Sequence, residues 1–383
     1  MSFEYLNPER MKVFKLAKEV GRVPEFLVPL TPAEEDKVNQ IHEESILFDF
    51  HNNPIVLPEN MDEFQDYSRR GRFWTAYEGL RKSKISACLN GFGSLSYISS
   101  TIGYQFADVI HDLGMRFSDF EHHRDQVLIA RISSDIRQAK REGKVAMIAH
   151  LENAGAIGNV LDRLDALYGL GMRCMGLTHN DSNFIGSGRT DRRDGGLTHF
   201  GVQVVERMNE LSLLIDLAHA SDQVILDALE ISRQPCCSTH DCCLEISKNP
   251  RCKSDAILRA IADRGGVVGI HAIPNVLSGR PDQGIEDVLR HIDHAVKIMG
   301  IDAVAVGTDS FFGDHVALHQ KILESVSLGK ELKTFPAPYM RGIENPGEFP
   351  NITRGLVKRG YSETDIQKII GGNALRIFED IVD

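Results

Sequence analysis

The sequence predicts an α/β fold: a TIM-type (β/α)8 barrel preceded by N-terminal helices. Short apolar runs alternate with amphipathic helices, about eight such runs can be counted, and each ends in a polar or chemically active residue. Strands that alternate with helices pair in parallel and are buried on both faces, and eight such units close into a barrel. A doubly wound open sheet is the alternative, which the lack of a glycine-rich phosphate turn after the first run disfavours.

The first 44 residues are expected to form a helical extension. PERMKVFKLAKEV has helical spacing, and Thr31-Pro32 signals the start of a second helix. The catalytic barrel then occupies residues 45–383. Its strands are expected in the runs SILFDFH (45–51), ISACLN (85–90), VAMIAHLE (145–152), MRCMGLTH (172–179), LLIDLAH (213–219), PCCSTH (235–240), VVGIHA (267–272) and VAVGTD (304–309).

Helices are expected between these runs, where apolar residues recur every three to four positions: 159–171, 200–212, 221–232, 254–266 and 285–300. A region rich in Gly, Pro and His around 310–350 is expected to form a long loop or short-helix region over the barrel mouth. The C-terminal stretch begins with a capping signal at Ser362 and reads as a closing helix interrupted at Gly371-Gly372.

The composition limits the kinds of molecule that the protein is expected to bind. The 383 residues carry 43 basic and 54 acidic side chains, and a net charge of −11 argues against nucleic acid or an anionic membrane. The N-terminus has no apolar leader, no run approaches the roughly 18 apolar residues of a membrane span, and no tail suits a lipid anchor. We therefore expect a cytoplasmic protein that acts on a small molecule.

Five of the seven cysteines crowd together, at positions 236, 237, 242, 243 and 252. The pattern CCSTHDCC resembles a metal motif, but two neighbouring cysteines on a strand point to opposite faces. Reduced thiols packed around a strand end are the expected outcome.

The ends of the expected strands carry the residues that could do chemistry. In a barrel these ends converge on one mouth. Imidazole and carboxylate groups are the ligands of Zn²⁺ and similar ions, and a carboxylate can bridge two of them. Glu152 is the bridging candidate, and Asn53 faces the same side as His51 because it follows two residues later. The candidates are His51, Glu152, His179, His219, His240, His271 and Asp309.

With these residues in place, the sequence resembles the membrane dipeptidase family, the renal dipeptidase-like zinc metallopeptidases, from about residue 45 to the C-terminus. The most specific block is Gly196–Ser221, with L-x-x-F-G-x-x-V-V-x-x-M-N-x-L ending in I-D-L-A-H. The other matching segments, in order, are DFHNNP, HLENAGAI, GLGMRCMGLTHNDSN, STHDCCLEISKNPR, GGVVGI, MGIDAVAVGTD and GGNALRIFE.

The resemblance implies a TIM-like barrel that holds two zinc ions and hydrolyses dipeptides through a metal-activated water. It implies metal ligation by His51, Glu152 as the bridge, and His219 and His240 at the second ion. It further implies that His179 contacts the substrate near the scissile carbonyl, that Arg251 binds the terminal carboxylate, and that Asp309 handles the proton. Homodimers are common in the family, so a homodimer is also an expectation.

Two departures from the family pattern bear on the site. Asn53 stands where the family usually has Asp, and a neutral amide is a poorer ligand, so the first ion is expected to bind weakly or to be a different divalent metal. Asn153-Ala154 stand where the family usually has glycines after the bridging Glu, which predicts a narrower pocket.

Two alternatives to a dipeptidase follow from Asn53, and the first of them also follows from the changed residues after Glu152. The same site could serve a metal-dependent amidohydrolase or deacylase that acts on a small carboxylate-bearing amide in a biosynthetic pathway. A barrel that binds a ligand without turnover is the other alternative. The sequence leaves the role of His271 open, and His122, His123, His291 and His294 are expected at the surface of helices.

Overall fold

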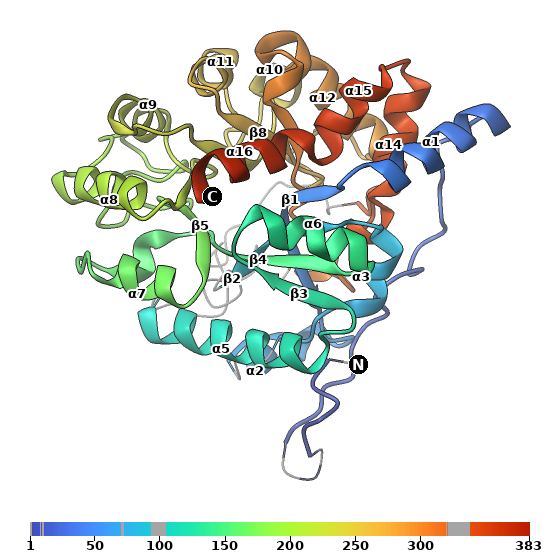
Figure 1. Ribbon diagram of the computed structural model, residues 1–383, viewed down its shortest axis with the longest axis horizontal. Coiled ribbons are helices and arrows are strands. Elements are labelled where there is room, and N and C mark those ends of the chain that lie inside the picture. Colours follow the sequence, from blue (N-terminus) through green and yellow to red (C-terminus); the bar gives the residue numbers. More distant parts are fainter. Residues whose placement is uncertain are drawn as a thin grey trace.

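The computed structural model describes residues 2–7, 9, 11–69, 73–92, 105–318, 320 and 338–383. Parallel strands form a curved sheet at its centre, and helices surround that sheet (Figure 1). All eight expected runs contain a strand: β1 (Phe48–Val56), β2 (Ala87–Phe92), β4 (Val145–Leu151), β5 (Met172–Gly176), β6 (Leu214–Asp216), β7 (Cys237–Asp241), β8 (Val267–Ile270) and β9 (Val304–Val306).

The sheet closes on itself through the chain that follows β9. β9 pairs with β8, and the continuation β10 (Phe311–Phe312) pairs in parallel with β1 on the other side. Between them, the amide of Asp309 donates to the carbonyl of His51 at 3.0 Å. The buried carboxylate of Asp49 accepts from both the amide and the hydroxyl of Thr308, at 2.8 and 2.6 Å. The TIM-type barrel is thus confirmed, and the open sheet is excluded.

One strand lies outside the expected pattern. β3 (Val127–Ala130) pairs with the first half of β4, whose second half pairs with β5. Because β2 occupies the opposite edge of β4, β3 and β5 share one edge. The run VLIA is not among the eight expected strands, so β3 is an addition to the predicted pattern.

The expected helices form, several with side-chain caps. Thr198, Ser221 and Ser254 each accept a hydrogen bond from a backbone amide in the first turn of the helix they precede. The main helices are α1 (Pro32–Glu44), α5 (Phe106–His122), α6 (Ser133–Glu142), α7 (Arg163–Gly169), α8 (His199–Glu210), α9 (Asp222–Ile231), α11 (Asp255–Asp263), α12 (Ile285–Met299), α14 (Pro350–Lys358) and α16 (Asn373–Val382). Shorter helices are α2 (Phe64–Arg69), α3 (Tyr77–Ser83), α10 (Leu244–Ser247) and α15 (Glu363–Gln367).

Helix α16 closes the end of the barrel opposite the strand C-termini. Its side chains, Phe378 among them, pack with the residues that open the strands, such as Phe48, Ala87 and Val267. Ser362 caps α15 as expected, and a π-helical turn at Lys368–Gly372 joins α15 to α16. Gly371 is required there because a Cβ would lie 2.0 Å from the carbonyl oxygen of Ile46. Apolar side chains therefore fill this end of the barrel, and the polar residues lie at the opposite end.

The prediction for the N-terminal segment was wrong in part. The expected helix over PERMKVFKLAKEV does not form among its described residues, although α1 does. Ala17 donates to the carbonyl of Leu57, and Glu59 donates to that of Lys15, at 3.0 and 2.8 Å. Backbone pairing with the chain after β1 therefore overrides the helical spacing.

The described parts of the region 310–350 combine loop with short regular elements. Its described parts contain β10 and a short 3-10 helix, Pro346–Glu348, while residues 319 and 321–337 lie outside the described part of the chain. Among the helices that are described, none has the length and apolarity that crossing a membrane requires.

The seven cysteines are buried and carry free thiols. Cys236 and Cys237 pack into different apolar clusters, which agrees with neighbouring residues of a strand pointing to opposite faces. The sulfur atoms of Cys242 and Cys252 lie 2.6 Å apart. No cysteine belongs to the two potential metal-binding groups found in the described residues.

Candidate active site

The C-terminal ends of the strands bring four of the expected ligands together. His51 lies in β1 and His240 in β7, while Glu152 directly follows β4 and His219 comes three residues after β6. Two overlapping groups could hold a metal ion: His51, Glu152 and His240, and Glu152, His179 and His219. Glu152 is common to both, which is the arrangement that a bridging carboxylate needs.

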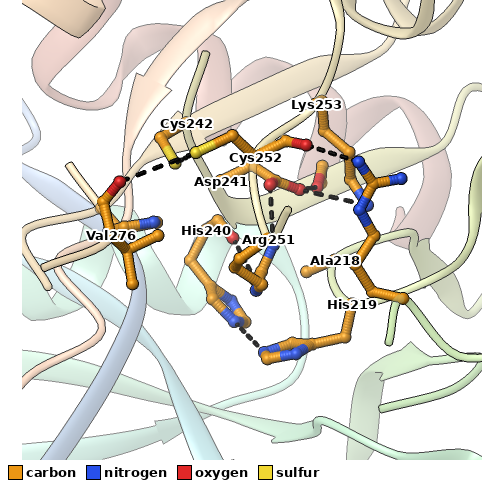
Figure 2. Close-up of polar contacts among 12 residues, drawn as sticks. Ala218, His219, His240, Asp241, Cys242, Arg251, Cys252, Lys253 and Val276 are labelled. Atoms are coloured by element: carbon orange, nitrogen blue, oxygen red, sulfur yellow. Dashed lines mark hydrogen bonds and ion pairs between the residues drawn. The ribbon is translucent and has the colours of Figure 1, made fainter. Parts of the chain in front are cut away.

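One carboxylate oxygen is the centre of the cluster. Oε1 of Glu152 lies 3.1 Å from Nε2 of His219 and 3.4 Å from Nε2 of both His240 and His179. The Nε2 atoms of His219 and His240 are themselves 2.9 Å apart (Figure 2). The rings of His179 and His219 stack with centroids 3.9 Å apart. Three imidazole nitrogens therefore converge on the same small space.

Asp309 lies across the same space. Its Oδ1 is 3.4 Å from Nε2 of His51, and its Oδ2 is 3.8 Å from Nε2 of His240. The backbone of Asp309 is left-handed, with φ of 52°, and that of His219 is also left-handed, with φ of 61°. Few residues adopt this conformation without cost, and it occurs often at functional sites.

Burial and neighbouring charges set the protonation states. Burial would raise the pKa of Glu152, but the surrounding histidines, His179 foremost, hold that pKa well below its usual range. Burial lowers the pKa of His219 and of His240 well below the usual histidine value. At neutral pH the site thus offers an ionised carboxylate and neutral imidazoles, which are the forms that bind a cation.

Arg251 is fixed beside the histidine cluster (Figure 2). Its guanidinium donates to Oδ1 of Asp241 at 2.7 Å and to the carbonyl of His240 at 2.8 Å. Asp241 also accepts from the hydroxyl of Ser238 at 2.6 Å. Burial opposes the charge of Arg251, but Asp241 raises its pKa. The structure thus places a permanent cation next to a candidate metal ligand.

Asn53 is buried next to His51. Its Nδ2 lies 3.3 Å from Nε2 of His51, so its amide reaches the metal-binding nitrogen but brings no negative charge. Gly91 makes room for it, because a Cβ at that position would lie 2.4 Å from Oδ1 of Asn53.

His271 is the candidate that the structure leaves out of the cluster. It is buried and belongs to neither potential metal-binding group, and its Nδ1 accepts from the amide of Ile273 at 3.1 Å. His123 and His291, expected at the surface, are buried instead. His291 accepts from the amide of Cys243 at 3.0 Å and donates to the carbonyl of Leu277 at 2.9 Å, so it joins α12 to its neighbours.

The sequence did not predict the residues that contact the candidate metal ligands on the side away from the metal-binding space. His150 lies 3.1 Å from His51, measured between the Nδ1 atoms, and its Nε2 lies 3.1 Å from Oδ2 of Asp216. Nδ1 of His219 lies 2.8 Å from Oδ1 of Asn180. A signal for His150 was available, since it precedes Glu152 by two residues and so shares its face of the strand.

The residues present fit a divalent ion such as zinc. Ligand atoms about 2.0–2.2 Å from one tetrahedral zinc ion lie roughly 3.3–3.6 Å from each other. The contacts of His219, His240 and His179 with Glu152, at 3.1–3.4 Å, have nearly this spacing. Imidazole and carboxylate are also the ligand types that zinc prefers.

Fold and site together define a metal-dependent hydrolase on a TIM-type barrel, with its polar cluster at the C-terminal mouth. The model of the membrane dipeptidase family, peptidase family M19, matches residues 35–334 and 323–383. The chain belongs to this family, and it is a metallopeptidase of the dipeptidase class.

Individual relatives agree with this assignment. Dipeptidase verJ from Clonostachys rogersoniana is 28% identical over 315 residues, which cover 81% of this chain and 72% of verJ. An amidohydrolase from Pseudomonas aeruginosa is 27% identical, with a TM-score of 0.74 over 90% of this chain and 99% of its own. A metallopeptidase from Rhodobacter sphaeroides, solved with a phosphinate mimic of the dipeptide L-Ala-D-Ala, shares the fold, with a TM-score of 0.70 at 20% identity over 88% of this chain and 100% of its own.

Proposed function

We propose that this protein hydrolyses dipeptides with two zinc ions, held by His51 and Glu152 on one side and by Glu152, His219 and His240 on the other. The position of Glu152 carries the proposal: its Oε1 lies 3.1 Å from Nε2 of His219 and 3.4 Å from Nε2 of His240, and Glu152 also belongs to the potential metal-binding group that contains His51. When bound, such ions lower the pKa of a water to near neutrality and polarise the carbonyl that it attacks.

Asp309 is the proposed general base and acid. Its two oxygens face the candidate ligands His51 and His240, which belong to different ions in this proposal. A carboxylate in that place can accept the proton of the attacking water and return it to the leaving amine. His179, at the less buried edge of the cluster, can donate a hydrogen bond to the oxyanion that develops at the scissile carbonyl.

Arg251 is the proposed anchor for the substrate's carboxylate. A guanidinium pairs with a carboxylate through two parallel hydrogen bonds. Asp241 and the carbonyl of His240 hold this guanidinium in place before substrate arrives. A fixed cation near the metal ligands limits the substrate length that can reach both, which favours dipeptides over longer peptides.

The experiment is a paired measurement of zinc uptake and turnover on a mixed panel of L-L and L-D dipeptides, with N-acyl amino acids beside them. Wild-type protein loaded with about two equivalents of zinc should cleave some of the dipeptides. Cleavage of N-acyl substrates alone would favour the deacylase alternative that Asn53 raises, and stoichiometric zinc without any hydrolysis would favour a binding protein.

The variant His219→Asn tests the ligand assignment. Asn tolerates the left-handed backbone at this position better than Ala does, so the change removes the imidazole with little added strain. We expect zinc uptake and turnover to be lost together. His42→Gln, a buried histidine hydrogen-bonded to Thr353 between α1 and α14, is the control that should keep both. Full activity in His219→Asn would refute the proposal.

A further inference from the structure

His150 has the surroundings of a group that orients a metal ligand. It lies inside β4, has no exposed surface, and points to the same side as Glu152. Its ring meets that of His51 edge to face, with centroids 5.1 Å apart and the two Nδ1 atoms 3.1 Å apart. On its other side, Nε2 lies 3.1 Å from the buried carboxylate of Asp216.

Asp216 connects this contact to the second group of ligands. It accepts from the amides of Ala218 and Thr239 through Oδ1, and from the hydroxyl of Thr239 through Oδ2 at 2.8 Å. The same hydroxyl lies 2.9 Å from Nδ1 of His240. One buried carboxylate therefore reaches His51 through His150 and His240 through Thr239.

The hydrogen atoms in this chain of contacts can be assigned by counting. Asp216 accepts only, so the single hydroxyl hydrogen of Thr239 goes to Asp216 and its oxygen accepts from Nδ1–H of His240. An ion at Nε2 of His51 requires the hydrogen of that ring to be on Nδ1, so Nδ1 of His150 must then accept it while Nε2–H of His150 goes to Asp216. Both ligand histidines are then left with a lone pair on Nε2, the nitrogen that faces the metal-binding space.

We propose that His150 is a positioning residue, which fixes the ring and the tautomer of His51 for the first metal ion, with Asp216 as its anchor. The inference rests on the proposed function only in that an ion binds at His51. It carries particular weight for this ion because Asn53, whose Nδ2 lies 3.3 Å from Nε2 of His51, offers only a neutral amide. Hydrogen bonding to a carboxylate, here relayed by His150, raises the basicity of a metal-bound imidazole.

The test compares zinc affinities of the two sites by competition with a chelator. His150→Gln and His150→Phe should weaken one ion about 10- to 100-fold and leave the other unchanged, because removing such supporting partners typically costs this much. Asp216→Asn should weaken both ions, since Asp216 serves both histidines. A purely structural role for His150 would lower stability without separating the two sites. His42→Gln is the matched control and should change neither affinity.

A second readout is independent of zinc affinity and of activity. ¹⁵N-NMR of the imidazole groups should show Nδ1 of His51 protonated in wild-type zinc-loaded protein, and a changed environment for that nitrogen alone in His150→Gln. Equal affinities at both sites in wild type and His150→Gln, or protonation of Nε2 of His51, would overturn the inference while leaving the proposed function intact. A wild-type protein that takes up no zinc would overturn both.

Discussion

At the scale of single residues, the site depends on two positions where the backbone is left-handed. Asp309 and His219 both follow a strand and both have positive φ values, of 52° and 61°. A strand that simply continued would send alternate side chains to opposite faces. The left-handed turn directs each side chain back over the barrel mouth, so the local conformation at these two residues is part of the chemistry.

The variant Asp309→Asn removes the carboxylate while keeping a side chain that suits the left-handed backbone. Asn is among the residues that best tolerate a left-handed backbone, so the fold and the zinc content should be retained. Loss of the general base should lower kcat by about 10²- to 10⁴-fold. Steady-state kinetics on a cleaved dipeptide, with zinc measured in the same sample, checks this. An unchanged kcat would show that another group moves the proton.

Arg251→Lys tests the recognition of the substrate's carboxylate. Lysine keeps the charge but loses the planar fork, so KM should rise about 10-fold or more with a smaller change in kcat. The matched control is the same dipeptide with an amidated C-terminus, which offers no carboxylate to pair with. For that substrate the wild type and the variant should perform alike, and an equal KM change on both substrates would contradict the assignment.

The residues that could be found from the sequence are those at strand ends. His51, Glu152, His240 and Asp309 end apolar runs, so barrel topology alone gathers them. His150 and Asp216 lie inside such runs. The pattern of an apolar run does not indicate that a polar residue within it contacts a residue on another strand. Their hydrogen bonds join residues that are 66 to 99 positions apart, which no local pattern reveals.

At the scale of elements, α1 is attached to the barrel through a buried histidine. Nε2 of His42 lies 2.8 Å from the hydroxyl of Thr353 in α14. Burial lowers the pKa of His42 to about 4, with the charges of Lys84 and Lys140 as further causes. His42 must therefore stay neutral for α1 to remain docked on α14.

Because of His42, the free energy of unfolding should decrease as the pH drops. The folded-state pKa lies below the unfolded value of about 6.5, so protonation favours unfolding as pH drops from about 6.5 towards 4. The stabilisation is complete above pH 6.5, and its loss can reach about 3 kcal/mol. Urea unfolding at pH 7 and at pH 5 should show a steeper decline for wild type than for His42→Gln. Parallel declines would contradict the role of His42.

Gly371 allows the turn before α16 to touch β1. Gly371→Ala would place a Cβ 2.0 Å from the carbonyl oxygen of Ile46, and 2.7 Å from the amide of Phe48. Because both contacts are with backbone, the clash cannot be relieved by a rotamer, and we expect a loss of roughly 2–4 kcal/mol. Gly114→Ala, in α5 with open space around it, is the control and should not destabilise. Thermal unfolding of both variants measures the difference.

Elements were predictable where their residues repeat at a clear period. The strands of the barrel and the helices that follow them have such periods, and helix-capping side chains such as Ser221 and Ser254 agree with them. β3 adds to the edge of β4 that β5 also uses, an arrangement that a regular series of eight strand–helix units does not contain. The segment around Leu16 has helical spacing but pairs with Pro58, so its conformation depends on a partner about 40 residues away.

At the scale of the whole molecule, the two ends of the barrel have opposite characters. Aromatic and aliphatic side chains of α16 fill the end where the strands begin. Histidines and carboxylates occupy the end where they finish. In the proposed function a metal bound at the polar end would join β1, β4, β6 and β7, and it should therefore stabilise the whole barrel by mass action.

Removal of the metal should lower the thermal unfolding midpoint. Ligand that binds only the folded state stabilises it by about 4 kcal/mol at 1,000 times its Kd. Treatment with a chelator should thus shift the midpoint down by several degrees, and added zinc should restore it. His219→Asn should show a much smaller shift, because its second site is already impaired. Equal shifts in both proteins would place the stabilising metal elsewhere.

We propose that residues from across the chain hold two metal ions at one mouth of the barrel, with Glu152 shared between them. Anomalous diffraction at the zinc edge, from crystals of the zinc-loaded protein, would locate these ions. We expect two peaks on either side of Glu152, one beside His51 and the other beside His219 and His240. Zinc peaks only at other places on the protein would contradict it.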